Sequence, residues 1–168
     1  MEALMTTPVS VFEILLGKLT PYFLMGMGGM ALSVGMAVFL FDVPFRGSFL
    51  VLTGVSAVFL LSALSLGLLI STLARNQFVA GQVALVAAFL PAFMLSGFLF
   101  EIDNMPAAVQ AITYVVSARY LVSALQTLFL AGNVWSVIVP DVLAMLALAG
   151  VLLAVTARRT AKRLDRRH

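Results

Sequence analysis

Three long stretches without a charged residue constrain this sequence more than any other feature. The first lies between Lys18 and Asp42, and the others lie between Arg46 and Arg75 and between Arg75 and Glu101. They hold 23, 28 and 25 residues, and a helix of about 20 apolar residues crosses the hydrocarbon core of a bilayer. Only 10% of the chain is charged, against roughly 25% in soluble domains. We therefore predict an all-α integral membrane protein, because backbone in lipid must satisfy its own hydrogen bonds.

Four transmembrane helices are predicted. A further apolar stretch precedes the basic C-terminal tail, and Asp141 in its first turn is expected at headgroup level. The predicted spans are about 19–41, 49–73, 78–100 and 138–157, which together make 19–157 one transmembrane domain. No ionisable residue is expected deep inside a span, which argues against a self-contained ion-coupled transporter and against an intramembrane acid–base enzyme. If the protein moves a substrate, we expect the energy to come from another subunit.

The basic residues predict that both termini are cytoplasmic. The tail, 158–168, holds six Lys and Arg residues, and Lys18 and Arg75 fall on the same side of the predicted membrane. Only Arg46 and Arg119 then face out, as the positive-inside rule requires. The tail is interpreted as an anchor on anionic lipid. Nucleic-acid binding is excluded, because the chain has no soluble domain and no basic surface with interleaved aromatic residues.

The sequence offers few residues for metal binding, disulfide formation or nucleophilic catalysis. The chain has no cysteine, and its one histidine is His168, so no cofactor or metal site is expected. Hydroxyls such as Ser62 and Ser65 are interpreted as helix-packing groups rather than nucleophiles, since no basic partner is near in sequence.

The spans carry small residues at four-residue spacing, which places them on one helix face. Such faces let helices approach closely in lipid. They indicate packing within the bundle or dimerisation, and the sequence leaves both open. The clearest series is Ala80, Ala84, Ala88, Ala92 and Ser96.

Two segments are predicted not to span. Residues 1–18 form an amphipathic interfacial segment, either a membrane-surface anchor or a docking element for a cytoplasmic partner. Residues 101–137 are external yet apolar, and 15 uncharged residues between Asp103 and Arg119 are too few to cross. We predict re-entrant helices there, with Pro106 starting one and Gly132 ending the next.

Several short motifs of this sequence, taken in chain order, resemble those of the permease subunit of type-2 ABC exporters. The N-terminal stretch with Thr7-Pro8, Glu13 and Gly17-Lys18 resembles the coupling element of that family. The series Met94-Leu95-Ser96-Gly97-Phe98 followed by Met105-Pro106 resembles the end of its fifth span and the turn after it. Arg119-Tyr120 resembles its re-entrant helices. The family often has a proline just before this pair, where the chain has Ser117-Ala118.

Family members usually have six spans, so the chain resembles their C-terminal four-span portion. The resemblance implies a multi-pass protein of the bacterial plasma (inner) membrane, with an ABC ATP-binding subunit and a second permease copy as partners. It implies no enzyme activity or cofactor in this chain. The residues expected to couple to the ATPase are Glu2, Leu4, Thr7, Pro8, Glu13 and Lys18, and those of the re-entrant segment are Met105, Pro106, Arg119 and Tyr120.

The expected function is export of a hydrophobic or lipid-linked substrate. The alternative is a small four-helix membrane scaffold or assembly protein without transport activity.

Overall fold

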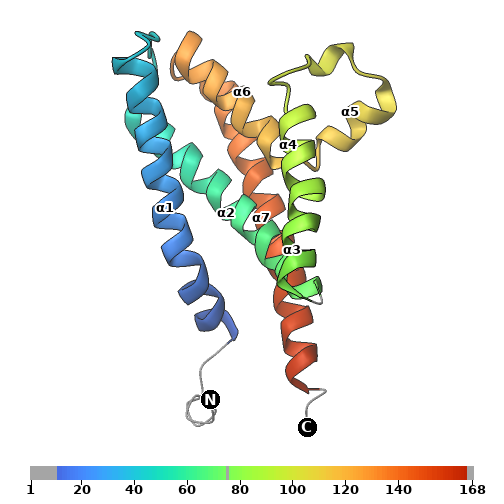
Figure 1. The fold of residues 1–168 in the computed structure, drawn as a ribbon. Helices are drawn as coiled ribbons and strands as arrows, with labels where there is room; N and C mark the ends of the chain where they lie inside the picture. Colours follow the sequence, from blue (N-terminus) through green and yellow to red (C-terminus); the bar gives the residue numbers. More distant parts are fainter. Residues whose placement is uncertain (1–10, 75, 166–168) are drawn as a thin grey trace.

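The computed structural model describes residues 11–74 and 76–165 and is built of helices, without a strand in those ranges (Figure 1). The chain order is α1 (Val11–Phe39), α2 (Phe49–Leu73), α3 (Gln77–Ala84), the π-helix η2 (Leu85–Phe89), α4 (Leu90–Met94), the 3₁₀ turn η3 (Ile102–Asn104), α5 (Ala107–Thr113), α6 (Ser117–Leu130) and α7 (Trp135–Asp165).

Four of these helical segments are long and apolar enough to cross a membrane: Leu16–Phe39, Phe49–Leu73, Gln77–Met94 and Trp135–Arg159. The all-α membrane fold with four candidate spans is thereby confirmed. The start of α1 and the end of α7 lie at one end of the bundle, whereas α5 and the α1–α2 connection lie at the other (Figure 1).

The third of these segments differs from its prediction. Its helix ends at Met94, not near Phe100, because Gly97 adopts a left-handed φ of +88° that an α-helix cannot continue. The Ser96 hydroxyl accepts a hydrogen bond from the Phe98 backbone N–H at 3.4 Å in this turn. A π-helical stretch interrupts the segment just before Pro91, which has no N–H to donate. The fourth helix begins at Trp135, three residues before the predicted Ile138.

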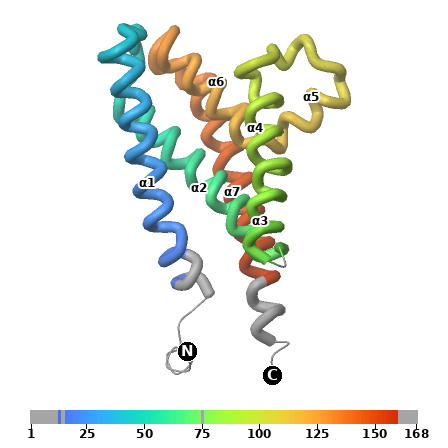
Figure 2. Tube along the Cα trace, in the orientation of Figure 1, coloured from blue at the N-terminus to red at the C-terminus, as the bar shows by residue number. Residues whose placement is uncertain are grey.

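The core lies where α2, α6 and α7 cross. It joins Leu52 and Val55 of α2 to Ala124 of α6 and to Ile138 and Met145 of α7, all at most 2% exposed. Lipid supplies no hydrophobic drive between helices, so close contact of complementary shapes holds such a crossing together. By contrast, α1 contacts mainly α2 and stands at the side of the bundle (Figure 2).

Two fully buried hydroxyl groups of α2 find hydrogen-bond partners within the protein. The Ser62 and Ser117 hydroxyls lie 2.5 Å apart and join α2 to α6. Ser65 donates to the carbonyl of Leu61 one turn earlier, a bond that a helical serine makes without a partner helix. Both Ser62 and Ser65 are fully buried, which agrees with packing hydroxyls rather than exposed nucleophiles.

A glycine turn ends α6 and ties it to the start of α2. Gly132 has φ +89°, and its N–H donates to the Thr127 carbonyl, as in a left-handed helix cap. The next residue, Asn133, accepts a hydrogen bond from the Ser48 backbone N–H at 2.9 Å. This bond satisfies a donor at the start of α2 that the helix itself leaves unpaired.

Gly132→Ala is therefore expected to destabilise the protein by about 1–2 kcal/mol, the cost of a left-handed non-glycine residue. The added Cβ would also stand 3.2 Å from the Arg46 carbonyl oxygen. Thermal unfolding in detergent measures the effect. The control is Gly150→Ala in α7, where a Cβ would meet nothing within 4 Å and alanine favours the helix. Equal melting temperatures for the two variants would contradict the prediction.

Candidate functional site

The α5–α6 pair is the most distinctive element of the bundle. The two helices meet at an angle of 84° across a short break, and both lie toward the end where α1 connects to α2 (Figure 1). The chain reaches α5 from that end and returns to it along α6, so the pair does not cross the bundle. A pair bent by this much forms either a broken span or a re-entrant loop, so the re-entrant segment stays a prediction.

The side chain of one glutamine, Gln110, holds the segment that precedes α5. The side-chain amide of Gln110 donates to the carbonyls of Ile102 at 2.9 Å and Met105 at 3.1 Å. It thereby ties the η3 turn to the helix that follows. Pro106 occupies the N-cap of α5, as predicted from its sequence position, and its missing N–H costs nothing at a helix start. The predicted residues Met105 and Pro106 thus form the bend into α5.

Arg119 and Tyr120 close the break between α5 and α6. The Arg119 guanidinium donates to the buried Thr113 hydroxyl and lies 4.1 Å from the centre of the Tyr114 ring, within the range of a cation–π contact. The Tyr120 hydroxyl donates to the Tyr114 carbonyl at 2.9 Å. Both predicted residues therefore fold the end of α5 back onto the start of α6.

Asp141 joins this polar cluster from α7. It lies on the second turn of the helix that begins at Trp135, inside the candidate span. The Ser123 side chain hydrogen-bonds to it, and the charge of Arg119 attracts it. One carboxylate oxygen, Oδ2, is buried without a hydrogen-bond partner. Asp141 is thus packed against α6, and its predicted place at headgroup level stays a prediction.

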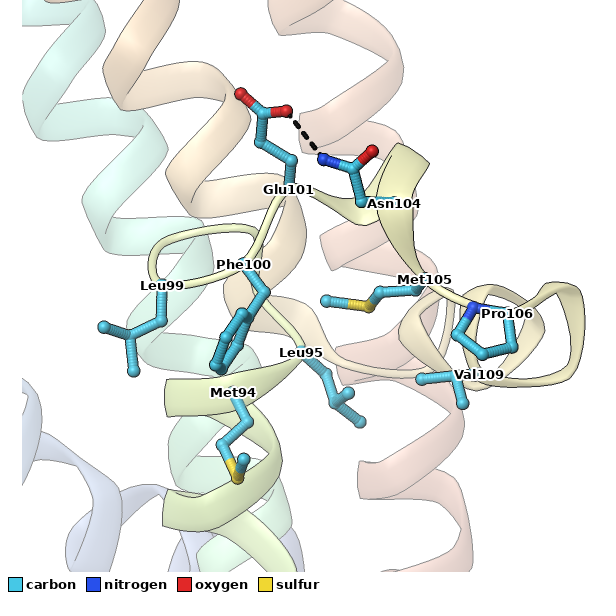
Figure 3. Close-up of a pocket in the computed structure, with 9 residues that line it drawn as sticks. All are labelled: Met94, Leu95, Leu99, Phe100, Glu101, Asn104, Met105, Pro106 and Val109. Atoms are coloured by element: carbon cyan, nitrogen blue, oxygen red, sulfur yellow. Dashed lines mark hydrogen bonds between the residues drawn. The ribbon is translucent and has the colours of Figure 1, made fainter.

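A pocket of about 530 Å³ opens between the end of α4 and the approach to α5. Met94, Leu95 and Phe100 form one side, and Met105 and Val109 form the other (Figure 3). Glu101 and Asn104 stand at its rim, where the Asn104 amide donates to the Glu101 carboxylate at 3.1 Å. The pocket therefore has apolar walls and a single charged group.

The predicted small-residue series lies on the covered side of the third segment. Ala80, Ala84, Ala88 and Ala92 are half-buried, and Ser96 is buried. Large apolar side chains on the same segment, such as Phe78 and Val86, are more than 60% exposed. Because α3 contacts α2 and α4 contacts α6, this arrangement favours packing within the chain for the small residues. A role for them in dimerisation stays a prediction.

Of the predicted coupling residues, the structure describes two. Glu13 and Lys18 are exposed near the start of α1, at the end of the bundle opposite the α5–α6 pair (Figure 1). Glu2, Leu4, Thr7 and Pro8 lie outside the described residues. The helix runs without a break from Val11 into the first candidate span, and a coupling role for these residues stays a prediction.

Sequence reasoning missed the groups that complete this site. Gln110, Thr113, Tyr114 and Asp141 bind the predicted residues, and Glu101 supplies the charge of the pocket. A lone glutamine in an otherwise apolar helix was the available signal, because a buried amide needs partners.

The described residues thus define a multi-pass α-helical membrane protein with a bent helix pair before its last candidate span. No group of three or more potential metal ligands occurs in the described part of the chain. Family comparison is consistent with this class: residues 1–158 match the model of the ABC-2 family transporter proteins. The chain belongs to that family, the type-2 ABC permeases, as its resemblance indicated.

The chain is 54% identical over 165 residues to the probable multidrug ABC transporter permease YbhS of Escherichia coli strain K12, covering 98% of this chain and 44% of the relative. It is 29% identical to the inner membrane transport permease YhhJ of the same strain, covering 96% of this chain and 43% of the relative. The chain therefore spans less than half the length of these relatives. No solved structure matches it significantly.

Proposed function

We propose that this chain forms part of the translocation path of an ATP-driven exporter for hydrophobic or lipid-linked substrates in the bacterial inner membrane. The family match over residues 1–158 is the observation that carries this proposal. It favours transport over the four-helix scaffold that the sequence also allowed. The relatives named as permeases, one of them an inner membrane protein, support the same location and class.

The energy for transport is proposed to come from a separate ATP-binding subunit. The candidate spans Phe49–Leu73 and Gln77–Met94 contain no charged residue, and Asp141 is the single acid in the described part of the last span. A proton or ion relay needs a chain of such groups. An outside source of energy is the simpler account, and ATP hydrolysis would take place on the partner rather than on this chain.

The start of α1 is the proposed contact with that partner. Lys18 lies at the same end of the bundle as Arg158 and Arg159 of α7, and basic residues favour the cytoplasmic side. Both chain ends would then be cytoplasmic, and residues 1–18 would lie where an ATPase can reach them. A second permease copy would complete the path between two sets of spans.

Co-purification tests this coupling. An ABC-type ATP-binding subunit from the same organism, co-expressed with this chain, is expected to remain bound through affinity purification in detergent. A Leu4→Asp, Pro8→Asp double variant is expected to retain less than a tenth as much, because two charges in an apolar contact lack partners. Val115→Asp, an exposed position in the break between α5 and α6 and outside the proposed contact, is the control and should retain the ATPase. Full binding by the double variant would refute the proposed contact.

A further inference from the structure

The pocket at the end of α4 has a composition that selects for one kind of ligand. Its volume of about 530 Å³ falls within the usual range for small-molecule sites. Nine side chains line it, and the one charged group among them is the carboxylate of Glu101. No lining residue is basic. A bound anion would therefore find no cation to pair with, whereas a bound cation would face a carboxylate.

The walls suit a large apolar ligand of variable shape. Met94 of α4 and Met105 of the approach to α5 both line the pocket, and the Met105 side chain extends toward Phe100 (Figure 3). Methionine side chains are unbranched and polarisable, so they adjust to ligands of different outline. Phe100 lies between Glu101 and Met94 (Figure 3), with more than half of its side chain exposed. An aromatic face of this kind attracts a cation as well as an apolar group.

The rim carboxylate is held in place by its neighbours. Asn104 donates to Glu101 at 3.1 Å, and the η3 turn that carries Asn104 is bound to α5 through the Gln110 amide. The negative charge therefore stands at a defined point above the apolar walls. An ionised carboxylate accepts more than one hydrogen bond, so the bond from Asn104 leaves it able to meet a ligand.

We propose that this pocket binds amphipathic organic cations, with the apolar body of the ligand between Met94, Phe100 and Met105 and its positive charge near Glu101. This inference deepens the proposed function by naming a substrate class, and it rests on that function only for the claim that the bound cation is then transported.

Two ions of nearly the same size and opposite charge test the charge preference. Equilibrium binding of tetraphenylphosphonium and of tetraphenylborate is measured on the purified chain in neutral detergent. The cation is expected to bind at least fivefold more tightly than the anion. Glu101→Gln is expected to weaken the cation about fivefold, the upper range for an exposed charge pair, and to leave the anion as tight or tighter. Unchanged anion binding would also show that the variant is folded.

Asp103→Asn is the matched control, because Asp103 lies two residues along the chain and does not line the pocket. It should change cation binding by less than twofold. Equal affinities for the two ions, or equal effects of the Glu101 and Asp103 substitutions, would overturn the proposal.

Thiol labelling tests the position of the ligand. The chain contains no cysteine, so Met105→Cys introduces a single reactive group into the pocket wall. Tetraphenylphosphonium is expected to slow its labelling by a neutral maleimide at least fivefold. The same ligand should not protect Val115→Cys, which is exposed outside the pocket. Equal protection at both positions would place the ligand elsewhere and refute the site.

The outcomes separate this inference from the proposed function. Selective cation binding together with failure to co-purify the ATPase would support the pocket and reject the coupling. Retained ATPase without selective binding would reject the pocket and leave the coupling supported.

Discussion

Ala124→Leu is expected to destabilise the bundle by about 2 kcal/mol, because overpacking a filled core costs typically 1–3 kcal/mol. Ala124 is fully buried on α6 in the same cluster as Leu52 of α2 and Met145 of α7. Three more heavy atoms at this position would force α6 away from both neighbours. Since close packing is what holds helices together in lipid, the loss is not offset by added hydrophobicity.

Thermal unfolding in detergent, followed by far-ultraviolet circular dichroism, measures this effect. The control is Ala147→Leu, an exposed position in the middle of α7, where the larger side chain has room and alanine and leucine have similar helix propensities. It should leave the melting temperature within one or two degrees of the parent, whereas Ala124→Leu should lower it by several degrees. A similar shift for the two variants would show that α6 is not packed at this crossing as described.

Arg119→Ala is expected to loosen the α5–α6 pair by about 2–3 kcal/mol, because hydrogen bonds to charged groups contribute about 1.5–3 kcal/mol. The change removes the donor to Thr113, which is fully buried, and the cation over the Tyr114 ring. It also removes the positive charge that attracts Asp141. The carboxylate would then remain against α6 with an unpaired oxygen and no opposing charge.

Hydrogen exchange resolved by mass spectrometry measures this loss at residues 107–130. Faster exchange is expected there and not in α2. Adding Asp141→Asn to Arg119→Ala should restore part of the protection, since it removes the charge left without its counterpart. The control is Arg46→Ala, an exposed arginine with one long hydrogen bond of 3.4 Å to the Leu130 carbonyl, which should change exchange little. No rescue by Asp141→Asn would contradict an electrostatic link between α6 and α7.

The bent pair of α5 and α6 shows which features single residues of the sequence can predict. Pro106 and Gly132 were predicted to start and end its helices, and the structure has α5 after Pro106 and a left-handed turn at Gly132. Both residues act through their own backbone torsions, which depend little on distant parts of the chain. The early end of the third helix at Met94 was missed, although Gly97 was visible, because hydropathy continues through Phe98 to Phe100.

The candidate site depended on contacts that no local pattern specifies. The rim charge of the pocket comes from Glu101 and its wall from Met94 and Val109, and their proximity follows from the turn at Gly97 and the tie through Gln110. Likewise, Asp141 was placed at headgroup level by its position in the sequence. The structure adds its hydrogen bond with Ser123 of α6, which the sequence did not indicate, and its place at headgroup level stays a prediction.

The sequence alone determined that this is a helical membrane protein of four candidate spans with a bent apolar pair before the last one. Uncharged length and single-residue torsions are properties of short stretches of chain, and a bilayer leaves them few solutions. The tertiary structure decided which faces are covered, where Asp141 lies and that a pocket with one carboxylate exists. Those features join residues far apart in the chain, such as Ser62 to Ser117 and Ser48 to Asn133. Such pairs form only when helix packing sets the distance between them.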